Sequence, residues 1–214
     1  MSLPLARLSV PARPDQPLVG DLRLALSRVH EFCGPARVAL AAILMGRMAG
    51  PVLWVCPGWQ PERLYPDGLA PFADPGRLVM ARARRVEDLL WAAEEGLRSG
   101  AAPLVVADLP EPPALTPVRR LHLAAEAGTE AARHANRPPV MGVLLTPAAG
   151  GAPGVESRWQ MAPLPAPSRL LEQGSRWHLA RLRARMDPVA AWEVSQTGAG
   201  RFDLSPCPAP DGTG

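Results

Sequence analysis

The chain has 214 residues, 47% of them hydrophobic, and a net charge of +3 in which all 23 basic residues are arginine. This apolar fraction supports a packed globule and excludes a disordered protein. The length allows one domain with an extended terminal segment. The three cysteines are too far apart for a zinc or redox motif, and no apolar run is long enough to span a membrane. Without a recognisable signal peptide, we expect a cytoplasmic protein.

The first part of the chain predicts an irregular arm followed by a strand, a helix and a second strand. The arm covers 1–27, because its first 20 residues contain four prolines and residues 22–26 suggest only a short helical turn. An apolar stretch that ends in Gly-Pro predicts a buried helix over 36–48. The apolar runs at 29–33 and 52–56 are typical of buried parallel strands.

The next part of the chain continues this alternation and completes a core domain over 28–163. Further strands are predicted at 77–80, 104–107, 140–145 and 157–161, and further helices at 86–99 and 116–136. Gly100 is the expected C-terminal cap of one helix, and Thr116 the expected N-cap of the other. Strands that alternate with helices predict an α/β fold with a mostly parallel sheet covered on both faces.

The last part of the chain predicts a β-hairpin and then a disordered end. A proline-rich linker at 162–167 marks a boundary, and the segment 164–195 after it is the expected partner-docking segment. Within that segment, 177–185 and 189–194 predict the two strands of the hairpin. The Gly- and Pro-rich residues 196–214 are expected to be disordered.

Two of these strands end in residues typical of a nucleotide site. The strand at 29–33 runs into Gly34 and Pro35, as a strand enters a phosphate loop. Another strand ends in Asp108, at the position where nucleotide-binding proteins with a phosphate loop hold a metal ion. A phosphate loop closes with Gly-Lys-Ser/Thr, and its lysine contacts the β- and γ-phosphates. This chain has no lysine. Gly34, Pro35 and Asp108 therefore mark a degenerate nucleotide site, and we expect no catalysis, no cofactor and no metal. Asp108 has the simpler interpretation of a loop or helix cap.

Residues 29–163 resemble, in order and spacing, the RecA core of bacterial recombinases. The resemblance lies in the stretches 31–35, 77–101 and 105–117. The whole chain more closely resembles the ImuA family of short RecA-like proteins in bacterial mutagenic repair. The matching features are the His-Glu-Phe-Cys-Gly opening at 30–34, the Gly-Pro-Val-Leu-Trp-Val run at 50–55, the helix sequence at 89–100, the Arg-Trp pair at 158–159 and a tail that bears tryptophan and arginine.

The resemblance implies a RecA-like core and a function without catalysis. The chain would be an adaptor in damage-induced translesion synthesis that assembles with an ImuB-type Y-family polymerase homologue, with RecA as a second candidate partner. An active recombinase has Gly-Lys-Thr where this chain has 39–41, and a water-activating glutamate near the position of Gly58. Its DNA-binding loop corresponds to 146–154, which has no basic or aromatic residue and is interpreted as a flexible connection.

The predicted partner-binding residues lie in the C-terminal hairpin. They are Trp177, Leu179, Arg181, Arg183, Arg185 and Trp192. The first five are spaced two apart, so in a strand they would share one face. Tryptophan and arginine are enriched in protein interfaces, which favours a protein partner. A solvated edge strand and a weak contact with DNA phosphates remain alternatives.

Three other functions stay open from the sequence alone. A cell-division inhibitor like the SulA regulators would use a RecA-related scaffold without ATPase motifs. A RecA-like ATPase with a remodelled phosphate loop would hold ATP through Asp108, and a simple DNA-binding protein would use its arginines. A hydrolase is disfavoured, because Ser27 and His30 lack a supporting carboxylate or elbow motif. The four histidines show no metal-ligand spacing.

Overall fold

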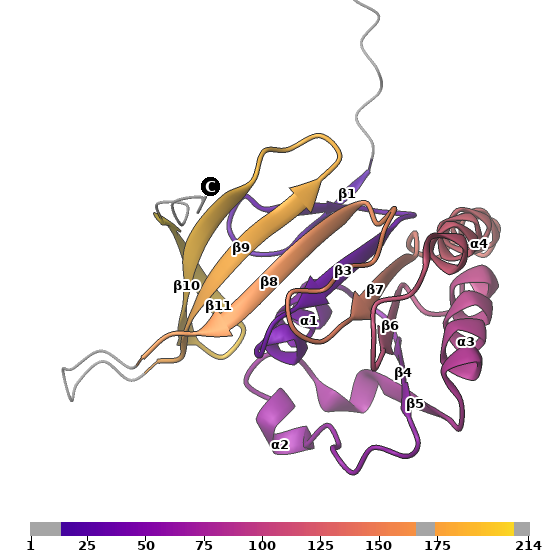
Figure 1. The fold of residues 1–214 in the computed structure, drawn as a ribbon, viewed down its shortest axis with the longest axis horizontal. Helices are drawn as coiled ribbons and strands as arrows, with labels where there is room; N and C mark the ends of the chain where they lie inside the picture. Colours follow the sequence, from indigo (N-terminus) through magenta and orange to yellow (C-terminus); the bar gives the residue numbers. More distant parts are fainter. Residues whose placement is uncertain (1–13, 166–173, 208–214) are drawn as a thin grey trace, which may run out of the picture.

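The computed structural model describes residues 14–165 and 174–207. It contains a nine-stranded sheet in the order β11-β10-β9-β8-β3-β7-β6-β4-β5 (Figure 1). The strands are β3 (Val29–Cys33), β4 (Val52–Pro57), β5 (Leu78–Ala83), β6 (Leu104–Asp108), β7 (Met141–Leu145), β8 (Ser157–Pro163), β9 (Arg176–Ala184), β10 (Ala190–Gly198) and β11 (Arg201–Cys207). The six strands from β8 to β5 are parallel, and β9, β10 and β11 extend the sheet antiparallel.

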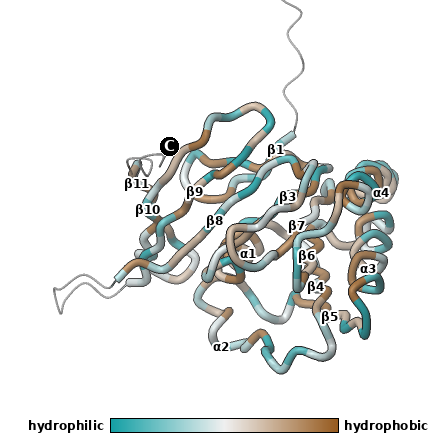
Figure 2. The backbone as a smooth tube through the Cα atoms, in the orientation of Figure 1, coloured by the Kyte–Doolittle hydropathy of each residue, from teal (hydrophilic) through white to brown (hydrophobic). Residues whose placement is uncertain are grey.

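Helices cover both faces of the sheet. Helix α1 (Arg37–Arg47) packs on one face, together with the short helix α2 (Pro66–Leu69). Helices α3 (Val86–Ser99) and α4 (Leu115–His134) pack side by side on the other face (Figure 1). In Figure 2 the central strands β4 and β6 are largely apolar, whereas polar segments alternate along α3 and α4. Among the described residues, no helix combines the length and the apolar character needed to cross a bilayer.

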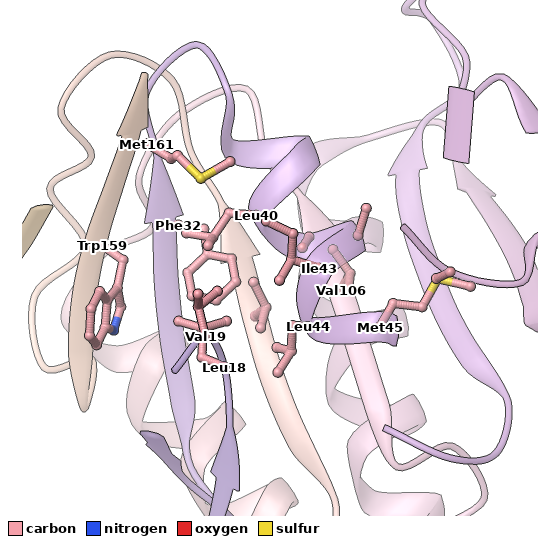
Figure 3. Packing of buried hydrophobic residues seen from close by; sticks show 14 of the residues in the cluster. Leu18, Val19, Phe32, Leu40, Ile43, Leu44, Met45, Val106, Trp159 and Met161 are labelled. Carbon is pink, nitrogen blue, oxygen red and sulfur yellow. The ribbon is translucent and has the colours of Figure 1, made fainter. Parts of the chain in front are cut away.

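The larger hydrophobic cluster lies between α1 and the sheet. Leu40, Ile43 and Leu44 of α1 pack toward Phe32 of β3 (Figure 3). On the other side of Phe32, the fully buried Trp159 of β8 extends the same cluster toward β9. The core is therefore continuous from the parallel strands into the C-terminal antiparallel strands.

The structure confirms the α/β class, with a large, mostly parallel sheet flanked by helices. Each predicted core strand and helix is present within a few residues of its expected bounds. Gly100 has the left-handed φ of 63° that ends α3 as predicted. The C-terminal hairpin is also present as β9 and β10, which pair antiparallel.

Three local predictions are wrong. Residues 14–27 are no irregular arm, because β1 (Asp15–Pro17) and β2 (Arg23–Ala25) form a two-stranded sheet where a helical turn was expected. Helix α4 is capped at Ala114 without a side-chain hydrogen bond, and Thr116 lies inside it. Residues 196–207 are ordered in β10 and β11, since β11 finds a strand partner in β10. The remaining parts of the arm, the linker and the tail, 1–13, 166–173 and 208–214, lie outside the described residues.

Burial explains the error at the N-terminus. Leu18, Val19 and Leu24 are almost fully buried and belong to the cluster around α1. Short segments without a strand pattern still become ordered when their apolar side chains complete a core. Likewise β8 extends to Pro163, within the first residues of the predicted proline-rich linker, and Pro163 lies opposite Trp177 of β9. The hairpin is thus part of the main sheet.

Candidate functional site

The turn that corresponds to a phosphate loop is short and internally bonded. Residues 34–36 alone connect β3 to α1. The Gly34 amide donates to Ala148 O at 2.9 Å, the Ala36 amide to Met161 O at 3.0 Å and the Arg37 amide to Gly34 O at 3.2 Å. Pro35 has no amide hydrogen. A phosphate loop binds its ligand through such amides, and over 34–37 each of them already has a protein acceptor.

Gly34 is required by this turn. Its φ of +84° lies in the left-handed region, and a Cβ there would come within 2.6 Å of Met161 O. The backbone of β8 therefore lies directly against the turn. This close approach leaves the glycine of the degenerate nucleotide site with a clear packing role.

Asp108 lies at the same edge of the sheet as this turn and faces an arginine. Its carboxylate is 4.0 Å from the guanidinium of Arg37, the first residue of α1. The pKa of Asp108 is raised, chiefly by burial. The charge of Arg37 opposes this shift, and the charge of Glu62 adds to it. The structure thus brings Gly34, Pro35 and Asp108 to the carboxyl ends of the parallel strands. The basic residue beside Asp108 there is Arg37, and there is no lysine. Within 14–165 and 174–207, no group of three or more His, Cys, Asp or Glu side chains is placed to share a metal ion.

The segment that corresponds to a DNA-binding loop is anchored by a buried carboxylate. Glu31 of β3 is fully buried and accepts hydrogen bonds from Thr146 Oγ1 at 2.7 Å and from the amides of Gly151 and Ala152 at 2.8 and 3.1 Å. Arg158 Nε donates to the other carboxylate oxygen at 2.5 Å. The interpretation of 146–154 as a flexible connection is therefore wrong for the part that Glu31 holds. Sequence reasoning missed this anchor, although a carboxylate inside an apolar strand is a signal that it has partners.

The predicted partner-binding row consists of the alternate side chains from Trp177 to Arg185. These side chains do not form one exposed face. Trp177 and Leu179 are buried in the cluster around α1, and Trp192 is half-buried against it. A bulge at Leu182 breaks the alternation, because Arg181 lies opposite Trp159 whereas Arg183 lies opposite Arg158. Directly opposed residues share a face of the sheet, so Arg181 and Arg183 lie on different faces. Only Arg183 and Arg185 of the row are exposed.

Arg181 has a structural environment of its own. Its guanidinium lies 5.4 Å from the ring centroid of Trp159 and 5.2 Å from that of Trp192. Its Nε donates to Pro188 O at 2.9 Å, and Asp187 lies 3.5 Å away. The side chain is largely buried by these contacts. Arg181 therefore stabilises the hairpin turn through cation–π and hydrogen-bond contacts.

A buried histidine network lies beside a cavity of about 750 Å³ between the β1–β2 sheet and β8–β9. His30 Nε2 is 2.9 Å from Ala25 O, a pure acceptor, so Nε2 carries the proton. His30 Nδ1 then accepts from Ser157 Oγ at 2.7 Å, and Ser157 accepts from Trp159 Nε1 at 2.7 Å. Ser27 instead contacts Thr129. A pair of Ser27 and His30, which the sequence analysis disfavoured, is not formed. His30 bonds instead to Ser157, which is far from it in the sequence and shares no local motif with it.

Comparisons with known proteins add little to this description. No family model matches the sequence, and a comparison with curated proteins finds no relative. Among solved structures, the chain is similar to the crystal structure of SulA from Pseudomonas aeruginosa. That match has a TM-score of 0.44 and 16% sequence identity, and it covers 56% of this chain and 98% of SulA. A similarity of this size assigns no function to the chain.

Proposed function

We propose that this chain is a non-catalytic RecA-like adaptor in damage-induced mutagenesis, which assembles with an ImuB-type Y-family polymerase homologue. RecA is the second candidate partner. The observation that supports the absence of catalysis is the closed turn at 34–37, whose amides bond to other parts of the chain. The motif order over the core supports the assignment to mutagenic repair. A closed turn would leave the core to act as a scaffold for partner proteins.

The exposed tip of the β9–β10 hairpin is the surface that best fits partner docking. Arg183 and Arg185 are exposed, and between the strands Met186 and Val189 have 86% and 65% of their surface accessible. Large apolar side chains beside arginines are typical of protein interfaces. The tip therefore replaces the predicted row as the proposed contact with the polymerase homologue.

The closed turn predicts that the chain binds no nucleotide. Titration of the purified protein with Mg-ATP in a calorimeter should give no binding heat up to millimolar nucleotide, because the amides over 34–37 are used and Asp108 faces Arg37. Micromolar binding that disappears in Asp108→Ala would contradict the proposal and support a nucleotide switch.

Charge reversal at the hairpin tip should weaken partner binding. We expect Arg183→Glu/Arg185→Glu to reduce the affinity for the polymerase homologue by about tenfold or more, through lost contacts and like-charge repulsion. Affinity is measured by pull-down and by surface plasmon resonance at two salt concentrations. The matched control is Arg119→Glu/Arg137→Glu, which makes the same charge change at exposed positions in α4 and just after it. Equal binding by the tip variant and the control would refute the tip as the docking surface.

A further inference from the structure

A second cavity, of about 490 Å³, lies over β4 and β5 on the α1 face of the sheet. In the parallel register of these strands, Trp54 lies beside Met80 and Cys56 beside Arg82. Because side chains alternate between faces, these four residues point to the same side and form the floor of the cavity. Residues 62–64 and helix α2 form its walls.

The position and size of this cavity are those of a small-molecule site. In open α/β sheets, ligands bind at the carboxyl ends of parallel strands. Here Cys56, Arg82 and Asp108 lie at or next to the carboxyl ends of β4, β5 and β6. Small-molecule cavities typically measure roughly 300–1,000 Å³ and combine an apolar lining with a few polar groups. The cavity extends from this part of the sheet to the start of α1, because Val38 and Asp108 also line it.

The charges around the cavity favour an anion. Its ionisable lining residues are Glu62, Arg63, Arg82 and Asp108. Arg37 neutralises Asp108, so one negative and two positive charges remain, a net charge of +1. Among the described residues, the side chains of Arg63 and Arg82 have no ion-pair or hydrogen-bond partner. Two such guanidinium groups at the rim of an apolar cavity are suited to a carboxylate.

We propose that this cavity binds a small apolar monoanion, an aromatic carboxylate of one or two rings. Its ring system lies on Trp54, Cys56 and Met80, and its carboxylate faces Arg63 and Arg82. Contact with Met80 and the partly exposed Cys56 buries the apolar rings. The inference does not depend on the partner-docking role, because the hairpin tip and this cavity involve different residues.

Calorimetry with 2-naphthoate and its neutral isostere 2-naphthylmethanol tests the proposal on the full chain. We expect 2-naphthoate to bind at least about tenfold more tightly than the alcohol, because only the acid can pair with the arginines. Arg82→Gln should reduce this affinity about tenfold. Met80→Trp, at a partly exposed position of the floor, should block the cavity and abolish binding.

The control is Arg84→Gln, an exposed arginine just beyond β5 that does not line the cavity, and it should bind like the wild type. Circular dichroism checks that each variant is folded. No binding of 2-naphthoate to the wild type would overturn the proposal. Equal affinity for the acid and the alcohol would also overturn it, as would unchanged binding in folded Met80→Trp or an equal affinity of Arg82→Gln and Arg84→Gln.

Discussion

Replacing Glu31 by alanine is expected to lower the free energy of unfolding by about 3–5 kcal/mol, the usual cost of breaking a buried ion pair from one side. The substitution leaves the Arg158 guanidinium without its carboxylate. It also leaves Thr146 and two backbone amides without acceptors. Each buried donor without a partner is costly, so the loop at 146–152 should detach from β3. Urea unfolding followed by circular dichroism measures the effect.

Glu126→Ala is the matched control for this prediction. Glu126 pairs with Arg28, but its side chain is half-exposed, so the same substitution should cost less than about 1 kcal/mol. The double variant Glu31→Ala/Arg158→Ala should cost less than the sum of its single variants, because it leaves no uncompensated charge. If Glu31→Ala were no more destabilising than Glu126→Ala, Glu31 would not be the anchor of the loop.

The core elements were predictable because their burial is uniform. Parallel strands covered by helices on both faces need apolar residues at every position, and the runs at 52–56 and 104–107 have them. The antiparallel hairpin also followed from its sequence, through alternation and a turn. By contrast, β1 and β2 have three residues each and no strand pattern. They form because Leu18, Val19 and Leu24 complete the core, which only the assembled fold reveals.

The candidate sites were less predictable because they depend on pairing between distant strands. The order of Gly34 and Asp108 along the chain pointed to one edge of the sheet, and the structure places both there. The bulge at Leu182 could not be foreseen, and it moves Arg183 to the face opposite Arg181. The cavity floor depends on the register of β4 with β5. Apolar strands contain little information about that register.

Acidification should destabilise the protein through His30. Burial lowers the pKa of His30 from 6.5 to about 4, although the hydrogen bond that His30 donates to Ala25 O opposes this shift. Between these pH values the unfolded chain takes up a proton that the folded chain does not, so falling pH favours unfolding. The stability due to neutral His30 is present above pH 6.5 and is lost as the pH falls to 4. The loss amounts to about 3 kcal/mol.

Urea unfolding at pH 7, 6, 5 and 4 separates this effect from other titrations. Burial also lowers the pKa of His122, which acts in the same direction, whereas the raised pKa of Asp108 acts in the opposite one. His30→Gln should therefore make the decline in unfolding free energy from pH 7 to pH 4 shallower by about 3 kcal/mol, while leaving a residual slope. His134→Gln, at the exposed end of α4, is the matched histidine substitution outside this network. A wild-type slope in His30→Gln would show that the network of His30, Ser157 and Trp159 does not depend on a neutral imidazole.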